Sequence, residues 1–251
     1  MIGIESFKKY FKGYENQYVI IGGTACEQVL EFNEYDYRVT KDIDMVLIIE
    51  ALTKEFGETF WNYIKEADYK YINKGSGKAQ FYRFAQPKSS DYPSMIELFA
   101  KSQDWFEGYM EKNVVPIHID DEVSSLSAIL LDEDYYSLLT KGIGIIDGVS
   151  ILKTEYLIPF KAKAWIDLTQ RKENGEKVDS KDIRKHKNDI IRLYVLLTPN
   201  IRVELPEAIK EDMSIFLKMM EKEEINLKQF SIRSTKDVLI KMLSEIYDIR
   251  N

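Results

Sequence analysis

The most informative part of the sequence is residues 18–49, which read YVIIGGTACEQVLEFNEYDYRVTKDIDMVLII. A compact apolar run at 18–21 stops at Gly22-Gly23, and the residues that follow, 25–32, have the character of a helix. A second apolar run, at 43–49, is rich in aliphatic and β-branched residues, which is typical of a strand. The stretch therefore predicts a strand, a glycine turn, a helix and a second strand, in that order.

Two carboxylates stand at the start of that second strand. Asp42 and Asp44 are two residues apart, and side chains at this spacing point to the same face of a strand. Like charges on one face repel unless something neutralises them, and Mg²⁺ prefers carboxylate oxygens together with substrate phosphates. Glu97 is the lone charge inside the apolar strand expected at 94–100, so it is the best candidate for a third ligand. These residues predict a site for two divalent ions, with Mn²⁺ as the alternative to Mg²⁺.

The segment Gly22-Gly23-Thr24 supplies the other half of the predicted site. Glycines let the backbone approach a phosphate closely, and a helix N-terminus, with Thr24 in the N-cap position, offers unpaired N–H groups. Each feature alone has a plainer interpretation. A Gly-Gly pair is usually a turn, Asp42 and Asp44 could be solvated surface charges, and Glu97 could pair with a buried arginine such as Arg83. The combination in this order is more specific than any part of it.

Composition limits the class of protein. The chain has 251 residues, enough for one large domain or two modest ones, and an ordinary globular share of charged residues. Its single cysteine, Cys26, excludes an intrachain disulfide framework and a cysteine-rich zinc site. No apolar run approaches the roughly 20 residues of a membrane span, and the first 14 residues lack the core of a secretory signal. We therefore expect a cytoplasmic protein with no membrane partner.

Strand and helix signals mix up to about residue 150, and long helical periods dominate after it. The sequence therefore predicts a mixed α/β chain of the α+β class, with a central mixed sheet in residues 1–150 and a helical domain in residues 151–251. Further strands are expected at 69–72, 79–85, 94–100 and 114–119, the first two forming a hairpin, and further helices at 55–67, 154–172, 180–197, 206–223 and 235–249.

The pattern Gly22-Gly23-Thr24, followed by Arg38-x-Thr40-x-Asp42-x-Asp44, resembles the nucleotidyltransferase fold of the DNA polymerase β superfamily. More narrowly, it resembles the AbiEii/AbiGii toxin family of bacterial nucleotidyltransferases. The second half is similar to that family's helical Lys…Arg…Lys-Asp-x-x-Asp segment, through IPFKAKA at 158–164, Arg171 and KHKNDI at 185–190. Together the matching segments span residues 18 to 197.

The resemblance implies an Mg²⁺-dependent enzyme that moves a nucleoside monophosphate from a triphosphate to an acceptor hydroxyl and releases pyrophosphate. It implies that the helical domain completes the active-site cleft. The metals would be held by Asp42, Asp44 and Glu97, the last as third ligand or as base for the acceptor hydroxyl. The nucleotide would be held by Gly22, Gly23, Thr24, Arg38 and Thr40, with Lys161, Asp182 and Asp189 from the second half.

The assignments in the second half leave alternatives open. The lysine that neutralises pyrophosphate is Lys161 or Lys163, and the spacing to Ala164 favours Lys161. The acid that orients the lysine or the acceptor is Asp182 or Asp189. If it is Asp189, a histidine stands where the family segment has its first acid. A cationic helix face opposite an acidic one is also common as a purely structural salt-bridge seam.

The distribution of charge along the sequence bears on which kind of molecule accepts the nucleotide. The net charge is -7, whereas residues 161–192 hold ten Lys/Arg and six Asp/Glu, a local balance of +4. A nucleic-acid contact is therefore expected to be local, although such a run could equally be a solvated helix face. The resemblance implies a toxin of a toxin–antitoxin or phage-defence pair, and from it we expect a cognate antitoxin as partner and a tRNA 3′ end or another RNA end as acceptor. The alternatives are a small-molecule nucleotidyltransferase, acting on an aminoglycoside-like alcohol, and a non-catalytic nucleotide- or partner-binding protein of the same fold.

Overall fold

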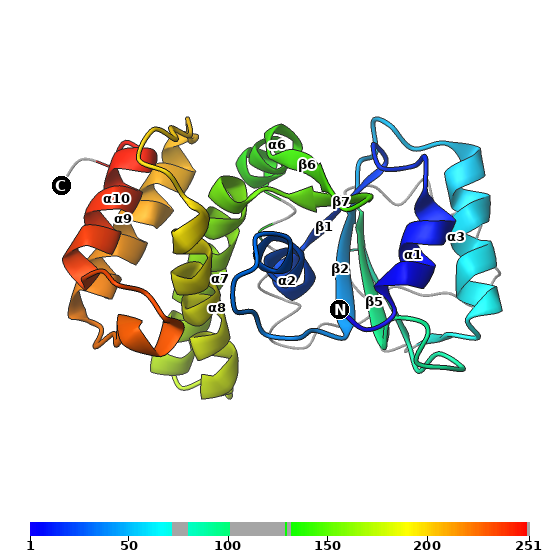
Figure 1. Cartoon of the computed structure of the whole chain (residues 1–251), viewed down its shortest axis with the longest axis horizontal. Coiled ribbons are helices and arrows are strands. Elements are labelled where there is room, and N and C mark those ends of the chain that lie inside the picture. The colour runs from blue at the N-terminus through cyan, green and yellow to red at the C-terminus, as the bar shows by residue number, and fades with distance from the viewer. Residues whose placement is uncertain (72–79, 101–128, 130–131, 250–251) are drawn as a thin grey trace. The chain divides into compact units, whose positions relative to one another are not determined.

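The computed structural model describes residues 1–71, 80–100, 129 and 132–249 (Figure 1). The strand expected at 114–119 and the turn of the hairpin expected after residue 72 lie outside these residues. The chain forms two compact units, each described here by itself. The sheet unit comprises Met1–Phe32, Arg38–Asp120 and Ile143–Leu152, and the helical unit comprises Asn33–Tyr37, Asp121–Gly142 and Lys153–Asn251. A division into functional domains at residues 150 and 151 stays a prediction.

A mixed sheet is the core of the sheet unit, and it confirms the expected mixed α/β class. Its described strands run in the order β3-β4-β5-β2-β1-β7-β6. The β2–β5 and β1–β7 pairs are parallel and the other pairs are antiparallel. The strands are β1 (Tyr18–Ile21), β2 (Asp42–Leu47), β3 (Lys70–Tyr71), β4 (Gln80–Ala85), β5 (Met95–Ala100), β6 (Ile143–Ile146) and β7 (Val149–Leu152).

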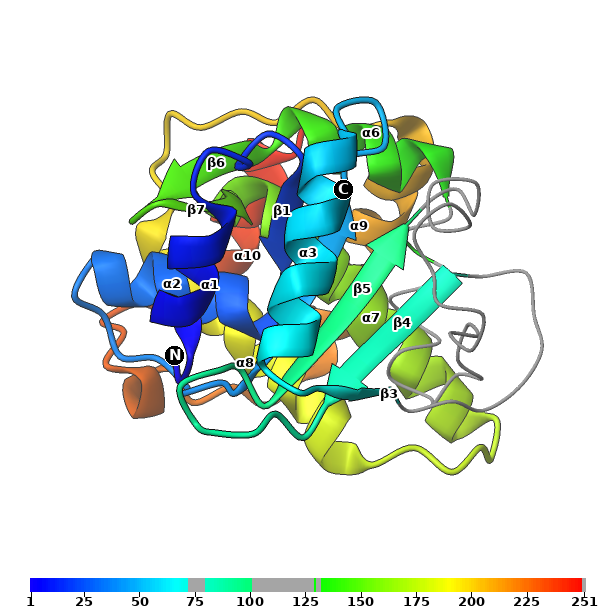
Figure 2. The ribbon, with the colours of Figure 1, turned by 90° about the vertical axis from the view of Figure 1, so that its right-hand side faces the viewer.

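Helices cover both faces of this sheet. Figures 1 and 2 show α1 (Ile4–Phe11) and α3 (Lys54–Glu66) on one face, and Figure 1 shows α2 (Gly22–Phe32) on the other. The face under α1 and α3 is built from aromatic rings. The ring of Tyr18 on β1 lies 5.4 Å from that of Phe7 on α1, and the ring of Phe60 on α3 lies 5.4 Å from that of Phe84 on β4. Edge-to-face contacts of this kind favour a tightly packed apolar layer.

The register of β1 and β2 decides which side chains of β2 enter that layer. Tyr18 is the partner of Leu47, so Leu47 and the residues at even spacing from it, Ile43 and Met45, face the aromatic layer. These three side chains are fully buried. The two aspartates of β2 therefore project from the other face, the one that carries α2.

The helical unit consists of packed helices and short 3₁₀ turns. Helix α7 packs on α8 and α9, and the rings of Trp165 and Phe216 meet edge to face at 5.5 Å. None of the helices in the described part of the chain has the length and the apolar character of a membrane span. The helices are α6 (Glu133–Lys141), α7 (Thr154–Glu173), α8 (Ser180–Leu193), α9 (Glu207–Lys222) and α10 (Lys236–Ile246), and the 3₁₀ turns are η1 (Tyr194–Leu196) and η2 (Leu227–Phe230).

The helices predicted after residue 150 are confirmed, with one difference. The period expected to be helical over 180–197 ends as an α-helix at Leu193 and continues as the 3₁₀ turn η1. Helices α1 and α6 and the β6–β7 hairpin were not predicted. The sequence did contain a signal for this hairpin, the pair Asp147-Gly148, because Asp-Gly is favoured in two-residue turns. Both residues adopt the positive φ that such a turn needs.

Candidate active site

Neighbouring strands of the sheet unit carry charged side chains in a row. Asp44 on β2 is the register partner of Glu97 on β5, and Glu97 is in turn the partner of Arg83 on β4. Asp42 lies two residues before Asp44 and projects from the same face. Both aspartates are half-buried, whereas Glu97 is buried. The register therefore gathers the acids proposed as metal ligands on one face, next to an arginine.

Glu97 is engaged by Arg83. The Nε and Nη2 atoms of Arg83 lie 2.8 and 2.6 Å from Oε1 of Glu97, and the two side chains are 17% and 10% exposed. In the described part of the chain, no three His, Cys, Asp or Glu side chains are grouped so that they could hold a metal ion. The structure thus displays the ion pair that the sequence left open as an alternative for Glu97. Both contacts fall on Oε1, so metal binding through both oxygens of Glu97 requires Arg83 to release it.

We expect Arg83→Gln to make the protein more responsive to Mg²⁺. The variant leaves Glu97 and Asp44 as neighbouring carboxylates without the guanidinium, so in metal-free buffer it should be less stable by about 1–3 kcal/mol. A divalent ion can then take both carboxylates, and ligand binding to the folded state raises its stability. The measurement is the midpoint of thermal unfolding with and without Mg²⁺, with Arg233→Gln, an exposed arginine, as control. Equal Mg²⁺ shifts in the variant and the wild type would contradict a metal site at Glu97.

The start of α2 lies against the Asp44 carboxylate. Gly22, the first residue of α2, has φ +68°, and a Cβ built on it would lie 1.8 Å from Oδ2 of Asp44. A Cβ on Gly23 would lie 3.0 Å from Cγ2 of Thr40 and 3.1 Å from Nη2 of Arg38. Glycine is therefore required at residue 22 both by conformation and by space. The N-terminal end of α2, which favours anions, is bordered by a carboxylate and a guanidinium.

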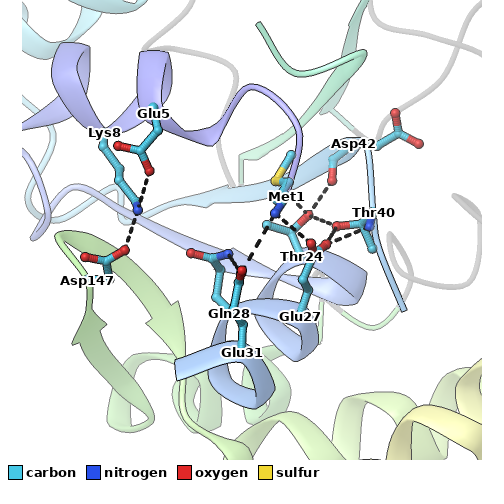
Figure 3. A network of polar contacts seen from close by, with 10 residues as sticks. All are labelled: Met1, Glu5, Lys8, Thr24, Glu27, Gln28, Glu31, Thr40, Asp42 and Asp147. Carbon is cyan, nitrogen blue, oxygen red and sulfur yellow. Dashed lines mark hydrogen bonds and ion pairs between the residues drawn. The ribbon is translucent and has the colours of Figure 1, made fainter. Parts of the chain in front are cut away.

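Two threonine hydroxyls tie this helix to β2 (Figure 3). Thr24 Oγ1 donates to the main-chain carbonyl of Asp42 at 2.5 Å and lies 3.0 Å from Thr40 Oγ1. Both threonines are buried. The expectation that Thr24 is an N-cap is wrong, because the helix already begins at Gly22 and the hydroxyl is used by the strand instead. Direct binding of a nucleotide by Thr24 and Thr40 stays a prediction.

Glu27 was missed by the sequence analysis. It is 1% exposed in α2, and its Oε2 accepts the N–H of Thr40 at 2.6 Å as well as the Thr40 hydroxyl. Its other oxygen, Oε1, lies 2.6 Å from the amino nitrogen of Met1. The signal that could have revealed it is an acid in a helix whose neighbours Ala25 and Cys26 read as buried.

In the helical unit the structure pairs Lys161 with Asp189. Lys161 Nζ lies 2.8 Å from Asp189 Oδ2, and both side chains are 4% exposed. Asp182 lies in the first turn of α8. Lys163 instead contacts Asp212 at 2.9 Å and Asp167 at 3.5 Å. Each candidate lysine therefore has its own carboxylate partner.

The surroundings of Lys163 favour its charged form. Burial acts to lower the pKa of Lys163, but the hydrogen bond that Lys163 donates to Asp212 and the charge of Asp167 outweigh it and raise the pKa above its ordinary value. The lysine is therefore a permanent cation at neutral pH. It cannot act as a proton acceptor there.

We expect Lys161→Met to destabilise the protein by about 3–5 kcal/mol, because it leaves Asp189 buried without its main partner. The double variant Lys161→Met/Asp189→Leu should lose much less, since it removes both buried charges. Urea unfolding followed by circular dichroism measures both. A single variant that loses less than about 1 kcal/mol would mean that Arg192, whose Nη1 lies 3.8 Å from Asp189, suffices as a partner.

The donor set of Asp42 and Asp44 fits a cation of the magnesium type. Both are half-buried oxygen donors on one face, and Mg²⁺ is commonly bound by one or two carboxylates plus substrate phosphates. Oε1 of Glu97, the third candidate ligand, is held by Arg83. The second ion expected from the sequence needs Glu97 as well.

Comparisons with known proteins give structural likenesses only. No protein-family model matches the chain, and no curated protein matches its sequence. An antigenic nucleotidyltransferase-like protein from Paracoccidioides brasiliensis is similar in structure, with 13% identity, coverage of 98% of this chain and 94% of that chain, and a TM-score of 0.49. JHP933 from Helicobacter pylori is similar at 14% identity, with coverage of 98% and 86% and a TM-score of 0.42. Because both TM-scores lie below 0.5, these likenesses carry no argument about the activity of this chain.

Proposed function

We propose that this chain is an Mg²⁺-dependent nucleotidyltransferase that moves a nucleoside monophosphate from a triphosphate to an acceptor hydroxyl. The observation that carries the proposal is the Asp44 carboxylate, which lies against the first residue of α2 with Asp42 on the same strand face. An ion held by these aspartates and a phosphate held at the helix N-terminus would be neighbours. This is the arrangement that a metal-bound triphosphate requires.

The chemistry follows from these groups. When bound, the ion would supply Lewis-acid stabilisation of the charge on the phosphate oxygens. Asp42 and Asp44 would hold it, and the N–H groups at Gly22 and Gly23 would donate to the β and γ phosphates. A bond forms between the acceptor oxygen and the α-phosphorus, and the bond from that phosphorus to the bridging oxygen breaks. The bonding electrons leave with pyrophosphate.

The acceptor proton needs a base, and the leaving group needs a cation. Glu97, once released by Arg83, would be the third metal ligand or the base that takes the proton of the acceptor hydroxyl. Arg38, next to Gly23, would neutralise phosphate charge. By resemblance, Lys161 would neutralise the charge developing on pyrophosphate, and its ion pair with Asp189 favours Asp189 over Asp182 as the acid that orients it.

The proposal is tested by incubating purified protein with Mg²⁺ and each labelled nucleoside triphosphate, with either total tRNA or a panel of aminoglycosides. Label on tRNA supports an RNA acceptor, and label on an aminoglycoside supports the small-molecule alternative. Pyrophosphate release is measured in parallel. No labelled product and no pyrophosphate with any acceptor would contradict nucleotidyl transfer.

The narrower biological proposal is that the chain is the toxin of an AbiEii/AbiGii-type pair with a cognate antitoxin. Its support is the sequence resemblance together with the +4 balance of residues 161–192, which suits an RNA end. We expect expression of the protein to arrest bacterial growth and Asp42→Ala to relieve the arrest. Arrest that persists in the Asp42→Ala variant would separate toxicity from the metal site.

A second function has one observation in its favour. The Arg83–Glu97 ion pair occupies the third carboxylate, as it would in a protein that keeps the fold and binds nucleotide without turnover. Calorimetry distinguishes the two functions. Mg²⁺-dependent nucleotide binding without pyrophosphate release, across RNA and small-molecule acceptors, would favour the non-catalytic protein.

A further inference from the structure

A buried carboxylate stands behind the candidate site. Glu27 lies in α2, five residues after its first residue, and its side chain is 0% exposed. Its Oε2 accepts both the main-chain N–H and the hydroxyl of Thr40 (Figure 3). Burying a carboxylate is costly unless it is hydrogen-bonded and paired. The sequence motifs assign it no function.

The hydrogen bonds continue from Glu27 toward the aspartates. Thr40 Oγ1 lies 3.0 Å from Thr24 Oγ1, and Thr24 Oγ1 lies 2.5 Å from the carbonyl oxygen of Asp42. A carboxylate and a carbonyl only accept, and each hydroxyl has one proton to give. The Thr40 proton therefore goes to Glu27, and the Thr24 proton is shared, in a three-centre hydrogen bond, between the Asp42 carbonyl and Thr40 Oγ1. A glutamine at residue 27 can donate as well as accept, so it would leave both hydroxyls free to turn.

This relay of Glu27, Thr40 and Thr24 joins the two halves of the site. Thr24 belongs to the first turn of α2, where a phosphate would bind, and Asp42 is the first residue of β2, where the ion would bind. The same two segments come close again at Gly23, where an added Cβ would lie 3.0 Å from Thr40 Cγ2. Besides the β1–β2 pairing of Ile21 with Asp44, one buried acid and two hydroxyls thus connect the two segments that would hold the phosphate and the metal.

We propose that Glu27 is a positioning residue for nucleotidyl transfer, which acts through Thr40 and Thr24 on the spacing between the start of α2 and Asp42. The inference rests on the proposed function. Reacting groups that are misplaced by about 1 Å lose on the order of 10²-fold in rate, whereas substrate binding to the separate halves is little affected. Glu27 therefore influences kcat more than KM.

Two variants test the relay at different links. Glu27→Gln removes the charge, and Thr40→Val removes the hydroxyl while it leaves the pair of Glu27 and the Met1 amino group intact. For both we expect kcat per folded molecule to fall about 10- to 100-fold, with KM for the nucleotide within about 3-fold of wild type. Thr40→Ser, which keeps the hydroxyl, should restore most of kcat. Glu31→Gln, the same change at a side chain 46% exposed on α2, should leave both constants unchanged.

A second measurement does not need turnover. Amide hydrogen exchange of the free protein should be faster at residues 22–26 and 40–44 in Glu27→Gln and Thr40→Val, and unchanged there in Glu31→Gln. Unchanged exchange in both relay variants would overturn the coupling. Faster exchange with wild-type kcat would overturn the positioning role and leave Glu27 a structural residue.

The two failures can be told apart. If the wild-type protein transfers no nucleotide to any acceptor, the proposed function fails, and positioning for transfer fails with it even where exchange shows the coupling. If the wild type is active and the relay variants match it, only the inference about Glu27 fails.

Discussion

Asp44→Asn is expected to abolish nucleotide transfer while the protein keeps its fold. The substitution keeps the shape of the side chain but removes the charge that would hold the ion, and metal stabilisation of phosphate charge is worth several kcal/mol. About 4 kcal/mol corresponds to a rate loss of roughly 10³-fold. The measurement is pyrophosphate release with the best nucleotide and acceptor, together with circular dichroism and thermal unfolding.

The matched control is Asp237→Asn, the same change at an exposed aspartate in the first turn of α10. It should retain wild-type transfer. Folded Asp44→Asn protein that transfers nucleotide at the wild-type rate would remove the metal site from the mechanism. A variant that unfolds would instead show that Asp44 is needed for the start of α2, and Asp42→Asn would then take its place in the test.

Gly22→Ala should cost both stability and activity. Alanine at φ +68° is strained by about 1–2 kcal/mol, and its Cβ would overlap the Asp44 carboxylate, whose Oδ2 lies 1.8 Å from the built position. Overpacking of this kind typically adds about 1–3 kcal/mol. We expect a total loss of about 2–5 kcal/mol in urea unfolding and, because Asp44 must move, a loss of transfer in the molecules that remain folded.

Gly148→Ala separates strain from overlap. Gly148 has φ +77°, but a Cβ there would meet nothing within 4 Å. This variant should lose only the conformational part, about 1–2 kcal/mol, and keep its activity. Equal losses of stability and activity in the two variants would mean that the Asp44 carboxylate moves aside at little cost. The close approach of Asp44 to α2 would then not matter for function.

Much of the sheet unit was readable from the sequence. The alternation of Asp42, Ile43, Asp44 and Met45 identifies β2 as a strand with one polar and one apolar face, since the period of a strand is short and local. The start of α2 was placed too late because Thr24 reads as an N-cap in the sequence, whereas its hydroxyl bonds the Asp42 carbonyl of a strand that is distant along the chain. Helix α1 carried a readable apolar face in Ile4, Phe7 and Phe11 that the sequence analysis did not use.

The candidate site was only half readable. A sequence pattern can show that Asp42 and Asp44 share a face and that a glycine pair precedes a helix, because these facts depend on neighbours along the chain. It cannot choose between a metal and Arg83 as the partner of Glu97, because that choice depends on the register of β4 against β5. The sequence likewise could not choose the partner of Lys161, because Asp182 and Asp189 on the same later helix were both candidates.

The order of the amino acids was enough to indicate a mixed α/β chain, the apolar and acidic faces of β2, and the helical character of the second half. Folding in three dimensions decided the partners of the buried charges, Arg83 with Glu97, Glu27 with Thr40 and Lys161 with Asp189, which are 14, 13 and 28 residues apart. The physical reason is that local periodicity fixes which face a side chain takes. Which charge it meets across that face depends on strand register and helix packing, which no local pattern encodes.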